Sequence, residues 1–226
     1  MTLRNAHRTG LLAAALLAMA GCSSVGELPR TVLGYAAPSL IGDPRYAAFE
    51  DNGRTIPAIP AAHLTDENRR QIVDFAGSEA PGTIVVDPAA HFLYLVEENG
   101  KAMRYRVGVG KAGFAFTGNA TIARKAEWPG WTPTPNMLKR EPERFGPYAS
   151  GLEGGLGNPL GARALYLYRG GRDTYYRIHG TNEPSTIGRS VSSGCIRMFN
   201  QDVIDLEDRV PVGANVVVRS ALGTAA

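Results

Sequence analysis

Two side chains in the last quarter of the sequence are of the types that perform nucleophilic catalysis together. Cys195 lies between Gly194 and Ile196, and His179 lies sixteen positions earlier. A free thiol with a pKa of about 8.5 is mostly protonated at neutral pH, so it needs an adjacent base or a lowered pKa. An imidazole can remove the thiol proton and later return it to a leaving amine. The pair predicts acyl transfer, provided that the loop between them folds back.

The residues beside the thiol add to this chemistry. Ser192, Ser193 and Gly194 are typical of a tight turn. The backbone N–H groups of residues 193–195 in such a turn could face the oxyanion of a tetrahedral intermediate. His179 is expected where a strand ends, and strand ends are where rigid scaffolds present catalytic groups. A buried structural cysteine is the alternative, but it fits these turn-forming neighbours poorly.

The start of the chain indicates export. Arg4 and Arg8 precede a continuous apolar run over residues 11–20, which is followed by a small residue. This pattern predicts a secretory signal over residues 1–21, too short to remain as a membrane-spanning helix. The mature chain is therefore expected outside the cytoplasm.

Cys22, directly after this segment, decides how the cysteines are used. Small residues before a cysteine resemble the lipobox of bacterial lipoproteins, apart from Met19, and that resemblance implies a lipid anchor on Cys22. By the same resemblance, Ser23 implies sorting to the outer membrane. Cys195 then has no disulfide partner in an oxidising compartment, and an unpaired exported thiol is expected to persist because it is used. An ordinary cleaved signal with an incidental cysteine is the alternative.

Composition bounds the remaining possibilities. With 226 residues, 44% hydrophobic and 20% charged, the chain is expected to form one globular domain with extensions. The net charge of +3 is small and the basic residues are scattered, so a nucleic-acid partner is excluded from the expectations.

The segment over residues 22–80 is rich in proline and poor in periodicity. It predicts an extended tether with one short helix, over Thr65 to Phe75, where Thr65 and Asp66 offer N-caps. We expect this tether to wrap the domain or to space it from a membrane. His63 in this segment is interpreted as a solvated loop residue.

From residue 81 onward the pattern changes to short, β-branched or aromatic runs bounded by turn residues. The expected strands are Thr83 to Asp87, His91 to Glu97, Met103 to Val109, Thr121 to Trp128, Arg163 to Arg169, Thr174 to His179 and Asn215 to Arg219. One helix is expected from Asn200, a candidate N-cap, to Arg209, with Pro211 ending it. Together they predict a mainly β fold, an antiparallel sandwich or partly closed barrel.

The residues around the thiol resemble a known family. His179-Gly180, the run Ser192-Ser193-Gly194-Cys195-Ile196-Arg197-Met198 and the following Asn200 are similar to the signature of the L,D-transpeptidase catalytic domain, a bacterial cell-wall cross-linking fold. The resemblance extends over residues 81–219, with a tail over 220–226. Many members carry histidine where this chain has Ser193, which affects a side-chain role there but no backbone N–H role.

The resemblance implies a mechanism and partners. Cys195 would attack the carbonyl after the L-centre of meso-diaminopimelate in a peptidoglycan tetrapeptide stem, releasing D-alanine and leaving a thioester. An amine would then take the acyl group: another stem in a 3-3 cross-link, the lysine of an outer-membrane lipoprotein or protein, or a D-amino acid. His179 would act as acid and base, oriented by the Gly180 carbonyl. No cofactor or metal is implied, and the place of action is the periplasm.

Three further residues are candidate substrate contacts. Arg197 resembles the family residue that holds the site or a substrate carboxylate, and an ion pair bracing the turn is the alternative. Arg177 is expected to line the site from the strand that enters it. Asn200 is the third candidate, with a helix cap and turn brace as the alternative.

An insert over 127–158 carries both tryptophans, several prolines and a glycine cluster. It is long and irregular, so it is expected to be either a lid that excludes water from the cleft or a structural flap packed on the sheet.

Other classes remain as alternatives. A papain-like enzyme would usually place its cysteine before its histidine, and a zinc site would need His63 and His91 beside the two candidate residues, so both are weak. An L,D-carboxypeptidase on the same fold, or a non-catalytic wall-binding lipoprotein, stays open. Acylation of Cys195 by a carbapenem would argue against the binding protein.

Overall fold

The structure is a computed structural model that describes residues 42–111 and 116–220. The predicted signal segment over 1–21, Cys22 and residues 221–226 of the tail lie outside the described residues. No helix in the described ranges is long and apolar enough to span a membrane.

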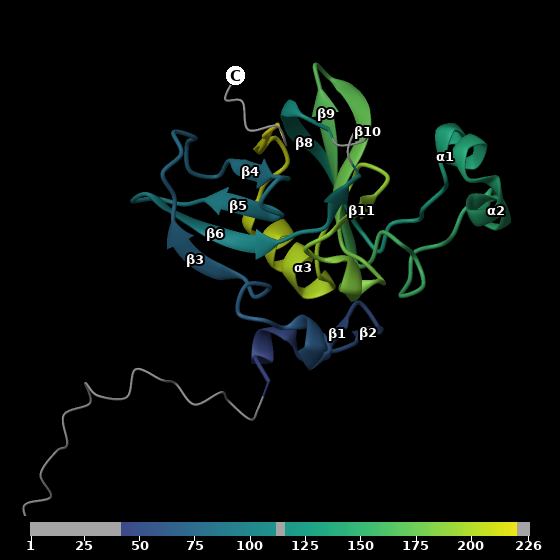
Figure 1. Cartoon of the computed structure of the whole chain (residues 1–226), viewed down its shortest axis with the longest axis horizontal. Helices are drawn as coiled ribbons and strands as arrows, with labels where there is room; N and C mark the ends of the chain where they lie inside the picture. The colour runs from purple at the N-terminus through teal and green to yellow at the C-terminus, as the bar shows by residue number, and fades with distance from the viewer. Residues whose placement is uncertain (1–41, 112–115, 221–226) are drawn as a thin grey trace, which may run out of the picture. The chain divides into compact units, whose positions relative to one another are not determined.

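The largest sheet of the described residues has nine strands (Figure 1). Its spatial order is β12 (Ile196–Arg197), β10 (Arg172–His179), β9 (Arg163–Arg169), β8 (Gly118–Glu127), β13 (Asn215–Val218), β4 (Ile84–Asp87), β5 (Phe92–Val96), β6 (Lys101–Arg106) and β3 (Gln71–Asp74). A short parallel pair joins β7 (Val109–Gly110) to β11 (Ser190–Ser192), and a hairpin joins β1 (Phe49–Asp51) to β2 (Arg54–Ile56).

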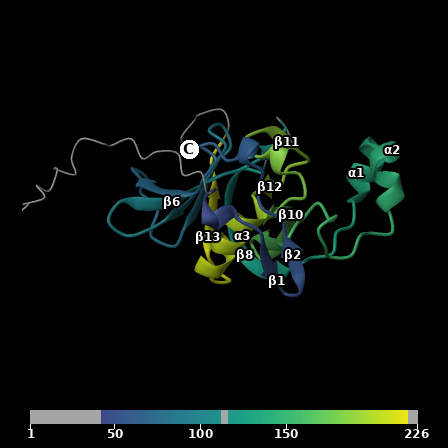
Figure 2. The ribbon, with the colours of Figure 1, turned by 90° about the horizontal axis from the view of Figure 1, so that it is seen from below.

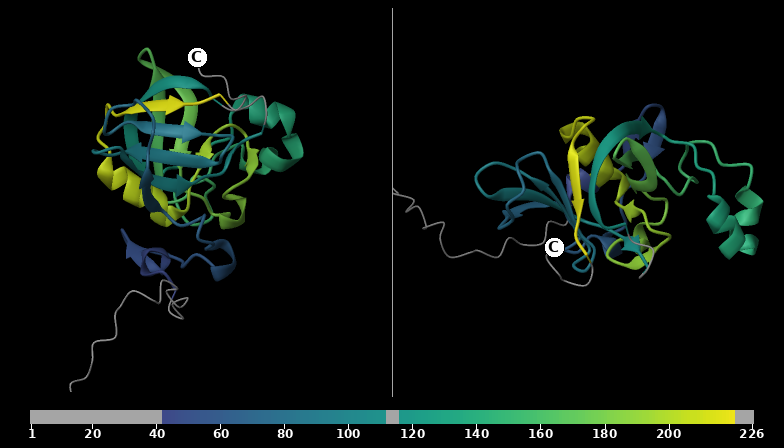
Figure 3. Two further views of the ribbon diagram at one scale, coloured as in Figure 1. Left: turned by 60° about the vertical axis from the view of Figure 1, so that its left-hand side comes forward. Right: turned by 90° about the horizontal axis from the view of Figure 1, so that it is seen from above.

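The two halves of the nine-stranded sheet enclose one helix, α3 (Asn200–Arg209), as Figure 1 and the two views of Figure 3 show. Fully buried side chains come from both halves, such as Leu93 and Tyr105 on one side and Leu165 and Ile178 on the other, and all belong to one cluster. Leu206 of α3 belongs to the same cluster. Burial of a side chain of this size stabilises the fold by about 1.5–3 kcal/mol, so the shared core holds β10 and β12 in place.

The expected mainly β fold is confirmed, and β9 and α3 have the predicted bounds. The sheet is mixed rather than wholly antiparallel, because β13 pairs in parallel with β4 and β10 pairs in parallel with β12. A crossover connection returns the chain in its original direction and so produces a parallel pair. The loop over 180–195 makes such a connection between β10 and β12.

The predicted helix over Thr65 to Phe75 is wrong, because Gln71–Asp74 forms the edge strand β3 against β6. Its residues alternate between half-buried and exposed, and Ile72 is 60% exposed. The apolar residues of this segment do not line one helical face. The unpaired edge of β6, in contrast, offers hydrogen-bond partners to the backbone N–H and C=O groups of every second residue. Two single-turn 3-10 helices, Pro44–Tyr46 and Ala61–His63, are the helical turns that precede it in the described residues.

Residues 42–80 pack on the sheet and on α3. The ring of Tyr46 meets Phe199 edge to face at a centroid distance of 6.0 Å. Arg70 forms an ion pair of 2.9 Å with Asp202, whose side chain is fully buried in the first turn of α3. The segment therefore contributes to the stability of the domain.

The insert forms two short helices, α1 (Pro135–Arg140) and α2 (Pro142–Phe145), followed by a 3-10 turn over Gly146–Tyr148. Thr134 caps α1 by accepting a hydrogen bond from the N–H of Met137, and Pro135 at the first helical position has a suitable φ. Figure 2 shows that α1 and α2 stand away from the sheet. Paired backbone hydrogen bonds between Trp131 and Leu152 close the base of the insert.

Candidate active site

The parallel pairing of β10 with β12 brings the two candidate reactive residues together. His179 is in register with Arg197, and Ile178 with Ile196. Cys195 directly precedes β12, so continuing the register places it beside Arg177 on β10. Adjacent strands lie about 4.8 Å apart, so Cys195 and His179 lie on neighbouring segments although sixteen residues separate them along the chain.

Ser192 braces the turn that carries Cys195. Its hydroxyl donates to the carbonyl of Cys195 at 2.6 Å and accepts from the N–H of Gly194 at 3.1 Å. The Gly194 N–H is therefore occupied, which contradicts its expected place among the oxyanion donors. The N–H groups of Ser193 and Cys195 have no acceptor among the described residues. These two donors are free to face a ligand.

His179 is 4% exposed, and one hydrogen bond fixes its tautomer. Its Nδ1 lies 2.5 Å from the carbonyl oxygen of Gly180. Because a carbonyl oxygen only accepts, Nδ1 carries the proton and Nε2 keeps its lone pair. The ring is thus held in the form in which Nε2 can accept a proton.

Asn200 holds the turn that follows His179. Its side-chain oxygen accepts from the N–H of Ala162 at 3.0 Å and of Thr181 at 3.2 Å, and its amide donates to the Thr181 carbonyl at 3.0 Å. A Cβ at Gly180 would lie 2.1 Å from that oxygen, so glycine is required there. Asn200 is buried and does not line the cavity described below. The structure therefore places it as a brace outside the cavity lining, and Phe199 rather than Asn200 is the N-cap of α3.

The two reactive groups are both held neutral. Burial lowers the pKa of His179 to about 3, the charge of Arg197 acts in the same direction, and the hydrogen bond to Gly180 opposes both. Burial raises the pKa of the Cys195 thiol, and a hydrogen bond from the Arg177 backbone and the charges of Arg177 and Arg197 oppose that rise only in part. At neutral pH the site thus holds an uncharged imidazole and an uncharged thiol.

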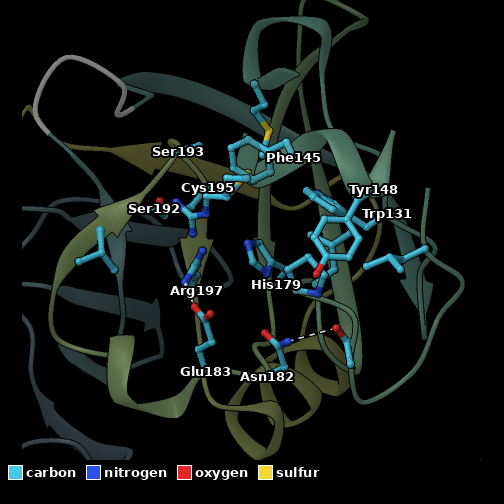
Figure 4. A pocket seen from close by; sticks show the side chains of 17 residues that line it. Trp131, Phe145, Tyr148, His179, Asn182, Glu183, Ser192, Ser193, Cys195 and Arg197 are labelled. Carbon is cyan, nitrogen blue, oxygen red and sulfur yellow. Dashed lines mark hydrogen bonds and ion pairs between the residues drawn. The ribbon is translucent and has the colours of Figure 1, made fainter. Parts of the chain in front are cut away.

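Both groups open into one cavity of about 330 Å³ (Figure 4). Figure 4 shows Cys195 and His179 on one wall and the aromatic rings of the insert across from them. The insert contributes Trp131, Met137, Arg144, Phe145, Tyr148 and Leu152. Trp131 lies 6.2 Å, centroid to centroid, from both Phe145 and Tyr148, so the rings form one apolar cluster. Of the two expectations for the insert, this position agrees with a cover over the site.

The two candidate arginines differ in position. Arg197 lines the cavity, and its Nη1 lies 3.0 Å from a carboxylate oxygen of Glu183. Arg177 does not line it. Its guanidinium forms an ion pair with Asp173 at 2.7 Å and stacks on Tyr166 at 4.2 Å from the ring centroid. Arg197 alone of the two therefore reaches the cavity.

Sequence reasoning missed Glu183 and the bracing role of Ser192. Glu183 neutralises Arg197 from the loop over 181–191, and a single carboxylate among Gly, Ser and Pro carries no recognisable signal. Ser192 braces the nucleophile turn, and its place in the Ser-x-Gly-Cys run was a signal that could have identified it. Ser193 lies at the rim of the cavity, and its hydroxyl is 3.3 Å from Nη2 of Arg140 in the insert.

The arrangement can perform acyl transfer. A thiol, a base with a free lone pair, two unoccupied backbone donors and a partly apolar cavity are the parts that a covalent acyl intermediate requires.

Residues 81–218 match the family model of the L,D-transpeptidase catalytic domain (YkuD). The match covers more than half of the chain and contains the whole cavity wall formed by β10, β12 and the insert.

Two curated relatives come from Escherichia coli strain K12. The probable L,D-transpeptidase ErfK/SrfK is 38% identical over 138 residues, which are 60% of this chain and 43% of the relative. The probable L,D-transpeptidase YbiS is 38% identical over 112 residues, which are 49% of this chain and 35% of the relative. The chain thus spans less than half the length of each.

A solved structure from Brucella melitensis, described as a probable carnitine operon oxidoreductase, is 52% identical to this chain. The likeness covers 70% of this chain and 91% of that one, with a TM-score of 0.47. A TM-score below 0.5 is too low to transfer a fold or an activity.

Proposed function

The chain belongs to the L,D-transpeptidase catalytic domain family, and from this premise we propose that it transfers an acyl group from a peptidoglycan stem peptide to an amine through a thioester on Cys195. The donor is a tetrapeptide stem cleaved after the L-centre of meso-diaminopimelate. The observation that carries the proposal is that the thiol and the free Nε2 of His179 open into one cavity.

In the first half-reaction the sulfur of Cys195 attacks the carbonyl carbon, while Nε2 of His179 takes the thiol proton. The C–N bond to D-alanine then breaks, and His179 returns the proton to the leaving amine. The products are a thioester and free D-alanine. Both groups begin uncharged, so proton transfer accompanies the attack and no thiolate needs to exist beforehand.

The oxyanion that forms on the attacked carbonyl meets the backbone N–H groups of Ser193 and Cys195. These donors are part of a turn that Ser192 holds in place, so they need no rearrangement during the reaction. Removing one such donor in a comparable site costs about 100- to 1000-fold in turnover. Arg197, held by Glu183 beside the thiol, positions a substrate carboxylate.

In the second half-reaction an amine attacks the thioester. The amine belongs to a second stem peptide, to a lysine of an envelope protein or to a D-amino acid, and water would give an L,D-carboxypeptidase instead. The apolar rings of the insert cover the cavity that holds the thioester, which supports an amine acceptor because a covered site excludes water.

This substrate sets the location. Peptidoglycan stems lie outside the cytoplasmic membrane, so we propose that the protein acts in the periplasm, anchored to the outer membrane by lipid on Cys22. The proposal for the anchor is supported by the sequence before Cys22 alone.

The test is release of D-alanine from a purified tetrapeptide stem, with and without an amine acceptor. The proposal expects D-alanine in equal amounts with the cross-linked product, and neither product from Cys195→Ala. D-Alanine without any amine adduct would identify a carboxypeptidase, and no D-alanine from the unmodified protein would leave the wall-binding alternative.

A further inference from the structure

A row of aligned side chains leads away from Cys195 across the sheet, on the side opposite the buried core. Arg124 on β8 is in register with Tyr166 on β9, and Tyr166 is in register with Arg177 on β10. Residues in direct register point to the same face of a sheet, so Arg124, Tyr166 and Arg177 share one face. His179, two residues after Arg177 on β10, points to that face as well and lines the cavity together with Cys195.

Tyr166 is the centre of this row. The guanidinium carbon of Arg124 lies 3.4 Å from its ring centroid and that of Arg177 lies 4.2 Å from it. The ring is 9% exposed. Stacking on a ring engages the face of a guanidinium and leaves its N–H groups pointing outward in the plane, where they form a fork for a carboxylate.

The two arginines differ in how these N–H groups are used. Arg177 donates to both carboxylate oxygens of Asp173, at 2.7 and 2.8 Å, and to the carbonyl of Tyr176. Arg124 is exposed and has no hydrogen-bond or ion-pair partner within residues 42–111 and 116–220. The ring thus holds the guanidinium of Arg124 in place, and its N–H groups are not hydrogen-bonded to any described residue. Its charge helps to lower the pKa of Asp173, whose carboxylate already accepts from Arg177.

We infer that Arg124, oriented by Tyr166, binds a carboxylate of the stem peptide. The carbonyl of the same peptide, after the L-centre of diaminopimelate, reacts at Cys195. The inference rests on the proposed function and names a specificity determinant for it. Three strand spacings separate Arg124 from Cys195, roughly 14 Å between backbones. An extended peptide advances about 3.4 Å per residue. The long arginine side chain can reduce the distance that the peptide must cover between Cys195 and the guanidinium.

A tetrapeptide stem offers two carboxylates within this reach, apart from the one that leaves with D-alanine. One is the α-carboxylate of the γ-linked D-glutamyl residue, and the other is the carboxylate at the D-centre of diaminopimelate. Both are planar anions that accept two parallel N–H bonds from a guanidinium. Amidating one carboxylate at a time shows which of the two binds Arg124.

The test measures binding without turnover. Cys195→Ala protein is titrated calorimetrically with the tetrapeptide and with its two singly amidated forms, alone and in combination with Arg124→Gln. We expect one of the two amidations to weaken binding about tenfold, which corresponds to the loss of one charge-assisted hydrogen-bonded pair. Arg124→Gln should remove the difference in affinity between that amidated peptide and the unmodified tetrapeptide. Arg124→Lys should restore the difference only in part, because an ammonium has no fork.

Arg104 supplies the matched control. Its guanidinium also stacks on an aromatic ring, 4.3 Å from the centroid of Phe92, and it also has no ion-pair partner in the described part of the chain. It lies on β6, which is four strands from β8 and five strands from β9 in the order of the sheet. Arg104→Gln removes the same charge and should leave the preference for the acid peptide intact.

An unchanged preference in Arg124→Gln would overturn the inference, and so would an equal loss of affinity for acid and amidated peptides. Absence of binding by any stem peptide to Cys195→Ala would overturn it as well. Release of D-alanine by the protein with an intact thiol reports separately on the proposed function, so that function can stand where the Arg124 site fails.

Discussion

The Nδ1 atom of His179 lies 2.5 Å from the carbonyl oxygen of Gly180, the next residue in the chain. The side-chain oxygen of Asn200 accepts from the N–H of Thr181, the residue after that glycine, and leaves no room for a Cβ at Gly180. A backbone carbonyl therefore does what a carboxylate does in a serine-protease triad: it fixes the tautomer and leaves Nε2 unprotonated. A neutral carbonyl adds no charge to raise the pKa of the ring, so burial dominates.

The rate of Cys195 acylation is expected to be constant between about pH 5 and pH 8. The pKa of His179 is lowered from 6.5 to about 3, so the ring remains a base throughout this range, and the pKa of Cys195 is raised, so the thiol remains protonated. The measurement is kcat/KM for D-alanine release against pH. A rate that falls with a midpoint near pH 6.5 on acidification would show that burial does not control the ring.

Arg197→Gln is expected to raise the pKa of His179. The positive charge of Arg197 is the second cause of the lowered value, and burial, the first cause, remains, so the new pKa should stay below 6.5. An NMR titration of the His179 ring measures the change directly. Arg189→Gln, a nearby arginine in the loop before β11 and outside the cavity lining, is the control. An unaltered pKa in Arg197→Gln would mean that Glu183 already cancels its charge.

Removing the tip of the insert is expected to favour water over amine as the acceptor. Paired backbone bonds between Trp131 and Leu152 allow residues 132–151 to be replaced by Asn-Gly, a turn that fits a two-residue hairpin. Without α1 and α2, water reaches the thioester, and the ratio of hydrolysis to amine transfer should rise about tenfold, about 1.4 kcal/mol of lost discrimination. Product analysis by chromatography gives the ratio, and an unchanged ratio would make the insert a structural flap.

Arg70→Met is expected to destabilise the fold by about 3 kcal/mol at pH 8, because it leaves the fully buried Asp202 without its charged partner. The folded-state pKa of Asp202 is raised to about 7, chiefly by burial, so its carboxylate is charged at pH 8 and protonated at pH 5. The cost of the substitution should therefore be smaller at pH 5. Urea unfolding at both pH values measures it.

Arg69→Met is the matched control for that substitution. Arg69 is adjacent in sequence. Its partner Asp66 is fully exposed, and its second partner, Asp43 at 3.9 Å, keeps a closer ion pair with Arg45, so the loss of Arg69 should cost less than about 1 kcal/mol. Equal costs for the two variants, or a cost for Arg70→Met that does not vary with pH, would contradict the assigned role of Asp202.

The sequence was sufficient for the elements whose patterns are strong and local. Alternation in Arg163–Arg169 and the apolar face ending at Pro211 gave β9 and α3 with the observed bounds. The segment over 65–75 was misassigned because its fate depends on the open edge of β6, which pairs with it across about thirty residues of chain.

The features of the site likewise fall into those that the sequence predicted and those that it could not. The residue types of Cys195 and His179 and the motif around them identified the pair that the fold brings to one cavity. The sequence could not show that Ser192 occupies the Gly194 N–H, that Arg177 turns to Asp173, or that Asn200 faces backbone groups. Those outcomes depend on hydrogen-bond partners from distant segments, and the amino-acid sequence alone does not show where these segments lie.

Intact-mass analysis after incubation with a carbapenem tests most directly whether His179 activates Cys195. The thiol opens the lactam ring and keeps every atom of it, so the protein should gain the mass of one inhibitor. We expect this adduct on the unmodified protein, none on Cys195→Ala, and a rate at least about 100-fold lower on folded His179→Gln, since a positioned base contributes about 10²–10⁴-fold. An adduct on Cys195→Ala, or an undiminished rate on His179→Gln, would contradict the account.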